Sequence, residues 1–112
     1  MRYIREAKAE LTAAQKTPYM AQGLVFEALK KARAAIYYSL GDPSLIEAIV
    51  HQTMHTERLI EDPALRLLVE IERTIQQITQ APRSNDEKMM EQVDDIIRLA
   101  SEIVELFTGE SA

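Results

Sequence analysis

The stretch that decides the fold is residues 17–44, TPYMAQGLVFEALKKARAAIYYSLGDPS. It begins with Thr-Pro, ends with Gly-Asp-Pro-Ser, and is apolar around most of a helical circumference in between. Proline is tolerated at the first helical position, and Thr or Asp is preferred before it because its side-chain oxygen accepts from free backbone N–H groups. Gly41 supplies a left-handed C-terminal stop. We therefore expect a helix over residues 18–40 that neighbouring helices cover on several sides.

The other prolines mark further helix boundaries. Asp-Pro pairs stand at residues 42–43 and 62–63, and Pro82 precedes Ser-Asn-Asp-Glu at residues 84–87, which has the spacing of a capping box. The predicted helices span residues 2–16, 18–40, 43–61, 63–80 and 85–108. Because no glycine separates the third helix from the fourth, a single long helix kinked at Pro63 is an alternative.

Apolar residues recur at spacings of three and four in these segments, which is typical of one face of a helix. The first helix carries such a stripe at Ile4, Ala7, Leu11 and Ala14. The last carries the most regular stripe, at Met89, Val93, Ile96, Ala100, Ile103 and Phe107. No segment shows the alternation of a strand bounded by turns. The sequence therefore predicts one all-α domain over residues 1–112, an antiparallel bundle of four to five helices centred on the second and the last.

Composition excludes several classes of protein. The chain has 112 residues and no cysteine, so it has no disulfide framework, thiol nucleophile or thiolate metal site. No apolar run approaches the roughly 18–20 residues that span a membrane, and the N-terminal sequence lacks the apolar segment of a secretory signal. We expect a cytoplasmic protein that does not enter a membrane.

Charge is distributed unevenly along the chain. The net charge is −5, which argues against a general nucleic-acid binder. Residues 1–41 nevertheless carry seven basic and three acidic side chains, whereas residues 42–112 carry six basic and fifteen acidic ones. Such halves attract one another within a fold or across a dimer. The apolar surface of residues 18–40 and an extra stripe at Leu65 and Val69 also favour a homodimer, although a central helix wrapped by four others explains the same pattern.

The two histidines form the first candidate site. His51 and His55 are spaced one helical turn apart, so both imidazoles lie on one side of a helix and can share a divalent metal. Glu47, one turn earlier, is the candidate third ligand. The zinc-protease motif needs a glutamate directly after the first histidine, where Gln52 stands. A metal here would need further ligands from another helix or subunit.

The same helix also carries its densest apolar arc at Leu45, Ile46 and Ile49. On a helical wheel, Glu47 and His51 point away from this arc. That separation favours a polar strip that faces solvent or an interface over a metal site. Pairing of Glu47 with His51 would follow from helix geometry alone, because residues one turn apart are neighbours on the helix surface.

An acidic face on the last helix, formed by Glu87, Glu91, Asp94 and Asp95, is the second candidate. Glu91-x-x-Asp94 resembles the spacing by which small helical nucleotide pyrophosphatases hold magnesium. Those enzymes also need a preceding Glu-x-x-Glu on a partner helix, and Glu57 to Glu61 is one residue too long for it. This departure favours a solvated face. A metal-dependent hydrolase that uses Mg or Zn is kept as an alternative.

A basic face on the first helix is the third candidate. Arg2, Arg5 and Lys8 lie close together there and can contact phosphates. Residues 3–8, YIREAK, followed by the alanine-rich second helix, resemble nucleotide-associated helical bundles of the HEPN type. In that family an arginine precedes a histidine by a short, slightly variable spacing in the ribonuclease active site. No arginine here precedes either histidine at that distance, so the resemblance implies a non-catalytic, nucleic-acid-associated accessory domain.

The sequence indicates no catalytic residue and no cofactor. No serine stands in a strand-turn-helix elbow, and the serines fit helix ends, caps or ordinary polar positions. The pattern favours a non-enzymatic module for protein–protein contact or self-assembly, working by helix-in-groove packing. A homodimer is the expected assembly, and nucleic acid is the less favoured partner.

Overall fold

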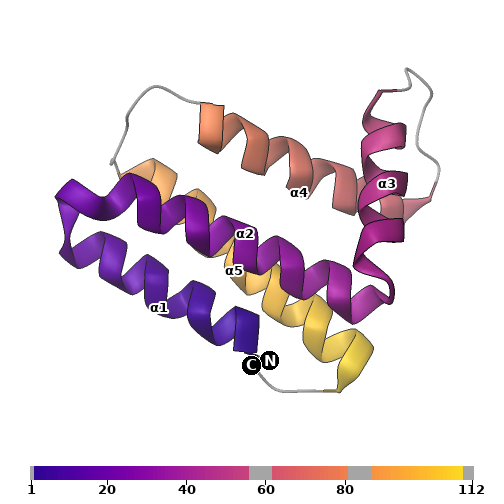
Figure 1. The fold of residues 1–112 in the computed structure, drawn as a ribbon, viewed down its shortest axis with the longest axis horizontal. Coiled ribbons are helices and arrows are strands. Elements are labelled where there is room, and N and C mark those ends of the chain that lie inside the picture. Colours follow the sequence, from indigo (N-terminus) through magenta and orange to yellow (C-terminus); the bar gives the residue numbers. More distant parts are fainter. Residues whose placement is uncertain (1, 56–61, 81–86, 110–112) are drawn as a thin grey trace.

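The protein is built from helices joined by short connections. The computed structural model describes residues 2–55, 62–80 and 87–109, and this part of the chain contains no strand. The elements are α1 (Arg2–Lys16), a 3-10 turn η1 (Pro18–Met20), α2 (Ala21–Leu40), α3 (Pro43–Met54), α4 (Pro63–Gln80) and α5 (Glu87–Thr108). The predicted all-α bundle is confirmed, as Figure 1 shows.

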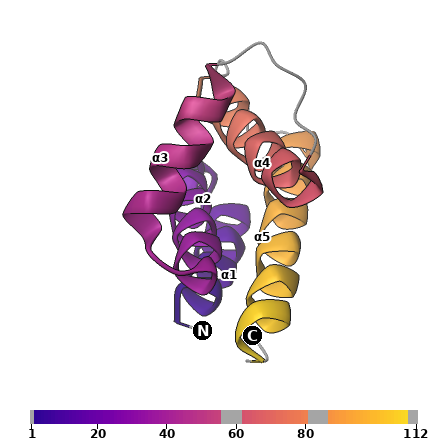
Figure 2. The same cartoon turned by 90° about the vertical axis from the view of Figure 1, so that its right-hand side faces the viewer.

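Four helices lie along one another, and α3 crosses one end of them (Figures 1 and 2). The chain reverses between α1 and α2, and α4 runs back along α2 before α5 reverses again. Helix α2 contacts α1, α3, α4 and α5, so it is the centre of the bundle. The explanation that one apolar helix is wrapped by its neighbours therefore accounts for residues 21–40.

The core follows most of the predicted stripes. All four stripe residues of α1 are buried. The buried residues of α2 are Ala21, Val25, Ala28, Leu29, Ala32, Ala35, Ile36 and Tyr37. In α5 the predicted stripe is buried except for Phe107, which is 56% exposed. Phe107 belongs to the last turn of α5, which projects beyond the neighbouring helices in Figure 2.

The start of the second helix differs from the prediction. Thr17 does not cap it, because its hydroxyl donates to the carbonyl oxygen of Ala13 (2.7 Å) and closes α1 instead. Residues 18–20 form the 3-10 turn, and α2 begins at Ala21 without a side-chain cap. A threonine hydroxyl bonds backward to a carbonyl four residues earlier as readily as it caps forward, and sequence alone does not separate the two.

Both Asp-Pro pairs begin helices as predicted. The side chain of Asp42 accepts from the backbone N–H of Ser44 (3.0 Å), and that of Asp62 accepts from Ala64 (2.9 Å). Gly41, between α2 and α3, has a φ of 131° and thus a backbone conformation that only glycine adopts without strain.

The third helix is shorter than predicted. It ends at Met54 with His55 as its C-cap, whereas the expected range was 43–61; residues 56–61 lie outside the described part. Because α3 and α4 run in different directions (Figure 1), the single kinked helix is wrong. Helix α5 begins at Glu87 rather than 85, and the predicted capping box at 84–87 lies outside the described residues.

Ion pairs join α2 to a neighbouring helix on each of its two flanks. On one flank, Lys31 pairs with Glu10 and Glu6 of α1; on the other, Arg33 pairs with Glu72 of α4. The buried alanines allow close approach of neighbouring helices, whereas the flank that faces α4 carries long side chains. Helix α4 therefore packs through long side chains, and a pocket lies on each side of it. No described helix is both long and apolar enough to cross a membrane.

Candidate functional site

A buried carboxylate lies between α2 and α4. Glu72 of α4 is 2% exposed and is the one charged residue that is buried within the described ranges. Its Oε1 lies 3.1 Å from Arg33 Nη1, and its Oε2 accepts from the hydroxyl of Tyr37 at 3.3 Å. Burying a carboxylate is costly unless it is paired and hydrogen-bonded, and here each oxygen has a partner.

Helix geometry explains how these three side chains meet. Arg33 and Tyr37 are one turn apart on α2, so they project to the same side. Glu72 follows Ile71 and precedes Ile75 by less than a turn, so it lies at the edge of the buried stripe of α4. The sequence patterns did not predict this cluster. The available signal was one acidic residue within an apolar stripe, and one arginine on the flank of an otherwise apolar helix.

The hydroxyl of Tyr37 keeps its proton in this setting. Burial, reinforced by the charge of Glu72, raises the pKa of Tyr37 well above its usual range. The phenol therefore remains a hydrogen-bond donor to the carboxylate at every physiological pH. On the other flank of α2, hydrogen bonding to Glu10 raises the pKa of Lys31.

A pocket of about 400 Å³ extends from this cluster along α2 and α4. One wall is a stripe of α2, and the other is a stripe of α4; His51 of α3 stands at one end. The lining residues are Phe26, Leu29, Lys30, Arg33, His51, Glu72, Ile75, Gln76 and Thr79. We call this space the α2–α4 pocket. Its volume lies in the range of small-molecule sites.

Two of the three predicted metal residues, Glu47 and His51, lie near each other in the structure. His51 Nε2 lies 3.9 Å from an oxygen of Glu47 and also 3.9 Å from Oε1 of Glu72. His55 is exposed at the C-terminal end of α3. Among the described residues, no three His, Asp or Glu side chains are arranged to hold a metal ion. The structure thus turns His51 toward α4 and leaves His55 in solvent, and metal binding stays a prediction.

The side of α3 that is buried is not its densest apolar arc. Val50 is fully buried, whereas Leu45 and Ile49 are 58% and 40% exposed. Ile46 and Met54 pack partly against the core. Because α3 is apolar on several sides, either side can face the core, and the crossing over α2 selects the one that carries Val50. His51, one position further on, consequently lies at the flank that faces α4.

The candidate nucleic-acid residues all lie on the exposed side of α1. Arg2 is paired with Glu6 at 3.6 Å, and its guanidinium lies over the ring of Tyr3, 5.2 Å from the centroid. Arg5 and Lys8 are exposed one turn apart. The structure brings the three cations to one surface without testing whether a phosphate binds there.

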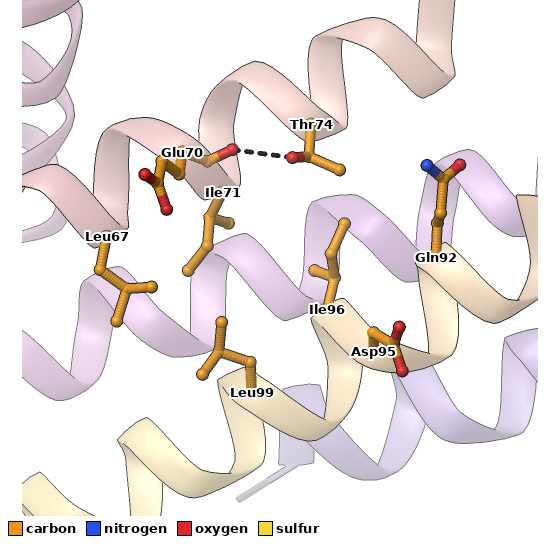
Figure 3. A pocket seen from close by; sticks show the side chains of 8 residues that line it. All are labelled: Leu67, Glu70, Ile71, Thr74, Gln92, Asp95, Ile96 and Leu99. Carbon is orange, nitrogen blue, oxygen red and sulfur yellow. Dashed lines mark hydrogen bonds between the residues drawn. The ribbon is translucent and has the colours of Figure 1, made fainter.

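A second, smaller pocket of about 250 Å³ lies between α4 and α5 (Figure 3). Leu67, Ile71, Ile96 and Leu99 project into it from the two helices, with Glu70, Gln92 and Asp95 at its edge. The Thr74 hydroxyl bonds to the Glu70 carbonyl of its own helix. Of the predicted acidic face, Glu91 is exposed and Asp94 pairs with Arg98 at 2.8 Å. The side chain of Glu87 lies outside the described part.

Three features therefore stand out: the α2–α4 pocket, the exposed apolar residues of α3, and the exposed cations of α1. Each is built from side chains whose positions follow from the helices described above. Comparisons of the chain with protein-family models, with curated proteins and with solved structures gave no match, so the geometry alone must support a function.

Proposed function

We propose that the protein is a non-enzymatic helical module that self-associates through the outward face of α3. This face consists of Leu45, Ala48, Ile49 and Gln52, which are all exposed. Their spacing of three and four residues places them in one stripe on the helix. The proposed assembly is a homodimer, and its proposed location is the cytoplasm.

The exposure of Leu45 and Ile49 is the observation that carries the proposal. Two large aliphatic side chains one turn apart remain in contact with water, while Val50 of the same helix is fully buried. Burying them against a second copy would remove apolar surface from water, which stabilises the contact. A contiguous exposed apolar stripe of this kind marks interaction surfaces more often than isolated exposed residues do.

The distribution of charge allows a second copy to dock on the outward face of α3 and disfavours other orientations. The net charge is −5, so two copies repel one another at most orientations. The outward face of α3 carries no charged side chain, because Glu47 and His51 lie on the flank that turns toward α4. Two such faces can meet without bringing like charges together. A two-fold axis would bring each Leu45 near the Ile49 of the partner.

The size of α3 limits the strength of this contact. A helix of 12 residues is about 18 Å long, and a standard stable interface buries about 800 Å² per partner. We therefore expect a weak dimer, with a dissociation constant of about 10–100 μM. The extra stripe predicted at Leu65 and Val69 is used inside one chain, because Val69 of α4 is buried and Leu65 packs partly against the core.

Sedimentation velocity from about 5 to 500 μM tests the proposal, since this range brackets the expected dissociation constant. Wild-type protein should shift from monomer to dimer over this range. Leu45→Glu should stay monomeric, because it places a charge at the contact. Leu106→Glu makes the same change at another exposed leucine, 78% exposed on α5, and should dimerise like the wild type. A wild type that is monomeric throughout, or a Leu45→Glu dimer of unchanged strength, contradicts the proposal.

A second candidate is nucleic-acid association through α1. The specific observation is that Arg5 and Lys8 are exposed one turn apart, beside Arg2. Fluorescence anisotropy with a single-stranded RNA would show binding that weakens steeply between low and physiological salt. Neutralising both residues as Arg5→Gln and Lys8→Gln should abolish it, whereas Leu45→Glu should leave it unchanged. Binding that is insensitive to the double substitution contradicts this candidate.

A further inference from the structure

The α2–α4 pocket joins an apolar floor to a cationic edge. Phe26 and Leu29 of α2 and Ile75 of α4 supply apolar surface. Lys30, Arg33 and His51 line the same space, and Glu72 is the one acidic residue among its lining. An amphipathic small molecule that carries an acidic group matches this combination, since ligand sites pair a largely apolar lining with a few convergent polar groups.

Because Glu72 is already paired within the fold, the other ionisable residues of the lining determine which charge a ligand should carry. Its two oxygens are taken by Arg33 Nη1 and by the hydroxyl of Tyr37 within the fold. The carboxylate is 2% exposed, so it is not available to attract a cationic ligand. Lys30, by contrast, keeps 64% of its side chain exposed, with Glu27 at 3.5 Å, and His51 keeps 47%, with Glu47 at 3.9 Å. Neither of these glutamates lines the pocket, so the exposed ionisable groups of the lining itself are basic.

The contact with Glu72 fixes the position of the Arg33 side chain at the pocket. Its contact with Glu72 uses one terminal nitrogen, and the side chain remains 32% exposed. A guanidinium has five N–H donors in a planar fork, so the donors not directed at Glu72 can bind one or two oxygens of an acidic group. A fixed cation loses less conformational freedom on binding than a free one, which favours affinity.

We propose that the α2–α4 pocket binds a small organic anion. Its acidic group would contact Arg33, with Lys30 and His51 beside it, and its apolar body would lie on Phe26, Leu29 and Ile75. The pocket uses the flank of α3 that faces α4, so this binding does not depend on self-association through the outward face of α3.

Matched probes test the charge and the apolar body separately. Wild-type protein is titrated in ¹⁵N-labelled form with 2-naphthoate, with 2-naphthylmethylamine and with acetate. We expect saturable shifts of backbone amides within residues 26–37 and 71–79 for 2-naphthoate, and at least tenfold weaker binding for the two other probes. A 2-naphthyl phosphate titration shows whether the site takes phosphate as well as carboxylate head groups.

Substitutions at the edge of the pocket test the site without breaking the buried cluster. Lys30→Gln combined with His51→Gln should weaken 2-naphthoate binding at least fivefold while leaving the thermal midpoint within a few degrees of wild type. Lys16→Gln removes one positive charge on α1, away from the pocket, and should change binding less than twofold. Equal affinity for the amine, no saturable binding up to ~10 mM 2-naphthoate, or equal losses in the two variants would overturn the proposal.

Discussion

The two flanks of α2 pack in opposite ways. Toward α1 and α5 the helix buries alanines and aliphatic side chains, and the neighbouring helices contact it along much of its length. The ion pairs of this side join the half-buried Lys31 to Glu6 and Glu10 of α1. Toward α4 it presents Lys30, Arg33 and Tyr37, and an open pocket separates parts of the two helices. The same helix thus belongs to a close-packed core on one side and to a polar, partly hollow contact on the other.

This difference shows what holds each side together. Close packing on the α1 and α5 side depends on volume, because a dense interior has no room for added atoms. The contact with α4 depends on a specific polar arrangement, because one buried carboxylate must keep both its partners. The two sides should therefore respond to different substitutions.

The largest effect should come from breaking the buried ion pair. Arg33→Ala leaves Glu72 buried without its cation, and we expect the free energy of unfolding to fall by about 3 kcal/mol in urea titrations. Arg98→Ala removes a matched arginine from an exposed pair with Asp94 and should cost less than about 0.5 kcal/mol. The triple variant Arg33→Met/Tyr37→Phe/Glu72→Met should lie within about 1 kcal/mol of wild type, since an apolar set needs no charge compensation and leaves no buried hydroxyl without its acceptor. A loss below about 1 kcal/mol for Arg33→Ala would show that the buried pair does not hold α4.

The second largest effect should come from adding side-chain volume on each of the two flanks of α2. Ala32 is fully buried in α2, and Ala32→Leu should cost about 2 kcal/mol through overpacking. Thr79→Leu adds apolar atoms beside the α2–α4 pocket, at an exposed residue, and should change stability by less than about 0.5 kcal/mol. Thermal unfolding of both variants measures the contrast. Equal costs would mean that the flanks are packed alike.

The hydroxyl of Tyr37 should contribute a smaller, pH-dependent amount. Tyr37→Phe removes a hydrogen bond to a charged acceptor and should cost about 1.5 kcal/mol at neutral pH. Because the folded state raises the pKa of Tyr37, the unfolded chain loses this proton first as the pH passes about 10. Stability present below that pH should therefore decline above it, by up to about 1.4 kcal/mol per pH unit.

Urea unfolding between pH 8 and pH 11 measures this decline, and the difference between wild type and Tyr37→Phe isolates Tyr37. The subtraction is needed because the pKa of Lys31 is also raised, which gives a loss of the same sign at high pH. Parallel pH curves for the two proteins would show that Tyr37 ionises as easily in the fold as in the unfolded chain.

The smallest effect should come from the first turn of α4. Asp62→Ala removes the side chain that accepts from the Ala64 backbone N–H, and we expect a loss of about 1 kcal/mol. Asp62→Asn keeps an oxygen acceptor and should restore most of it. Amide hydrogen exchange should show faster opening of α4 than of α2 in the alanine variant. Unchanged exchange in α4 would mean that its packing, rather than its cap, sets its local stability.

Local signals predicted much of this fold. The bounds of α1 and α4, the caps at Asp42 and Asp62, and the buried stripe of α1 all follow from residues within one or two turns of each other. Thr17 shows one limit of such signals, because its hydroxyl can bond backward to the Ala13 carbonyl or cap the helix that follows. Phe107 shows a second limit, because a regular apolar stripe does not reveal where the neighbouring helices end.

The candidate site could not be predicted in the same way. Tyr37 and Glu72 are 35 residues apart, and their meeting depends on how far α4 is shifted along α2. The buried side of α3 was equally undetermined, since Val50 and the pair Leu45 and Ile49 are all apolar. Which of them reaches water depends on how α3 crosses α2.

The sequence by itself determined the type of the elements, most of the helix ends, and the apolar stripes of α1 and α5, because caps and periodicity act within a single helix. Only the tertiary structure decided that Glu72 is buried with Arg33 and Tyr37, that a pocket opens beside them, and that α3 turns Leu45 and Ile49 outward. These features depend on the register and crossing of different helices, which are set by how whole side-chain surfaces fit together.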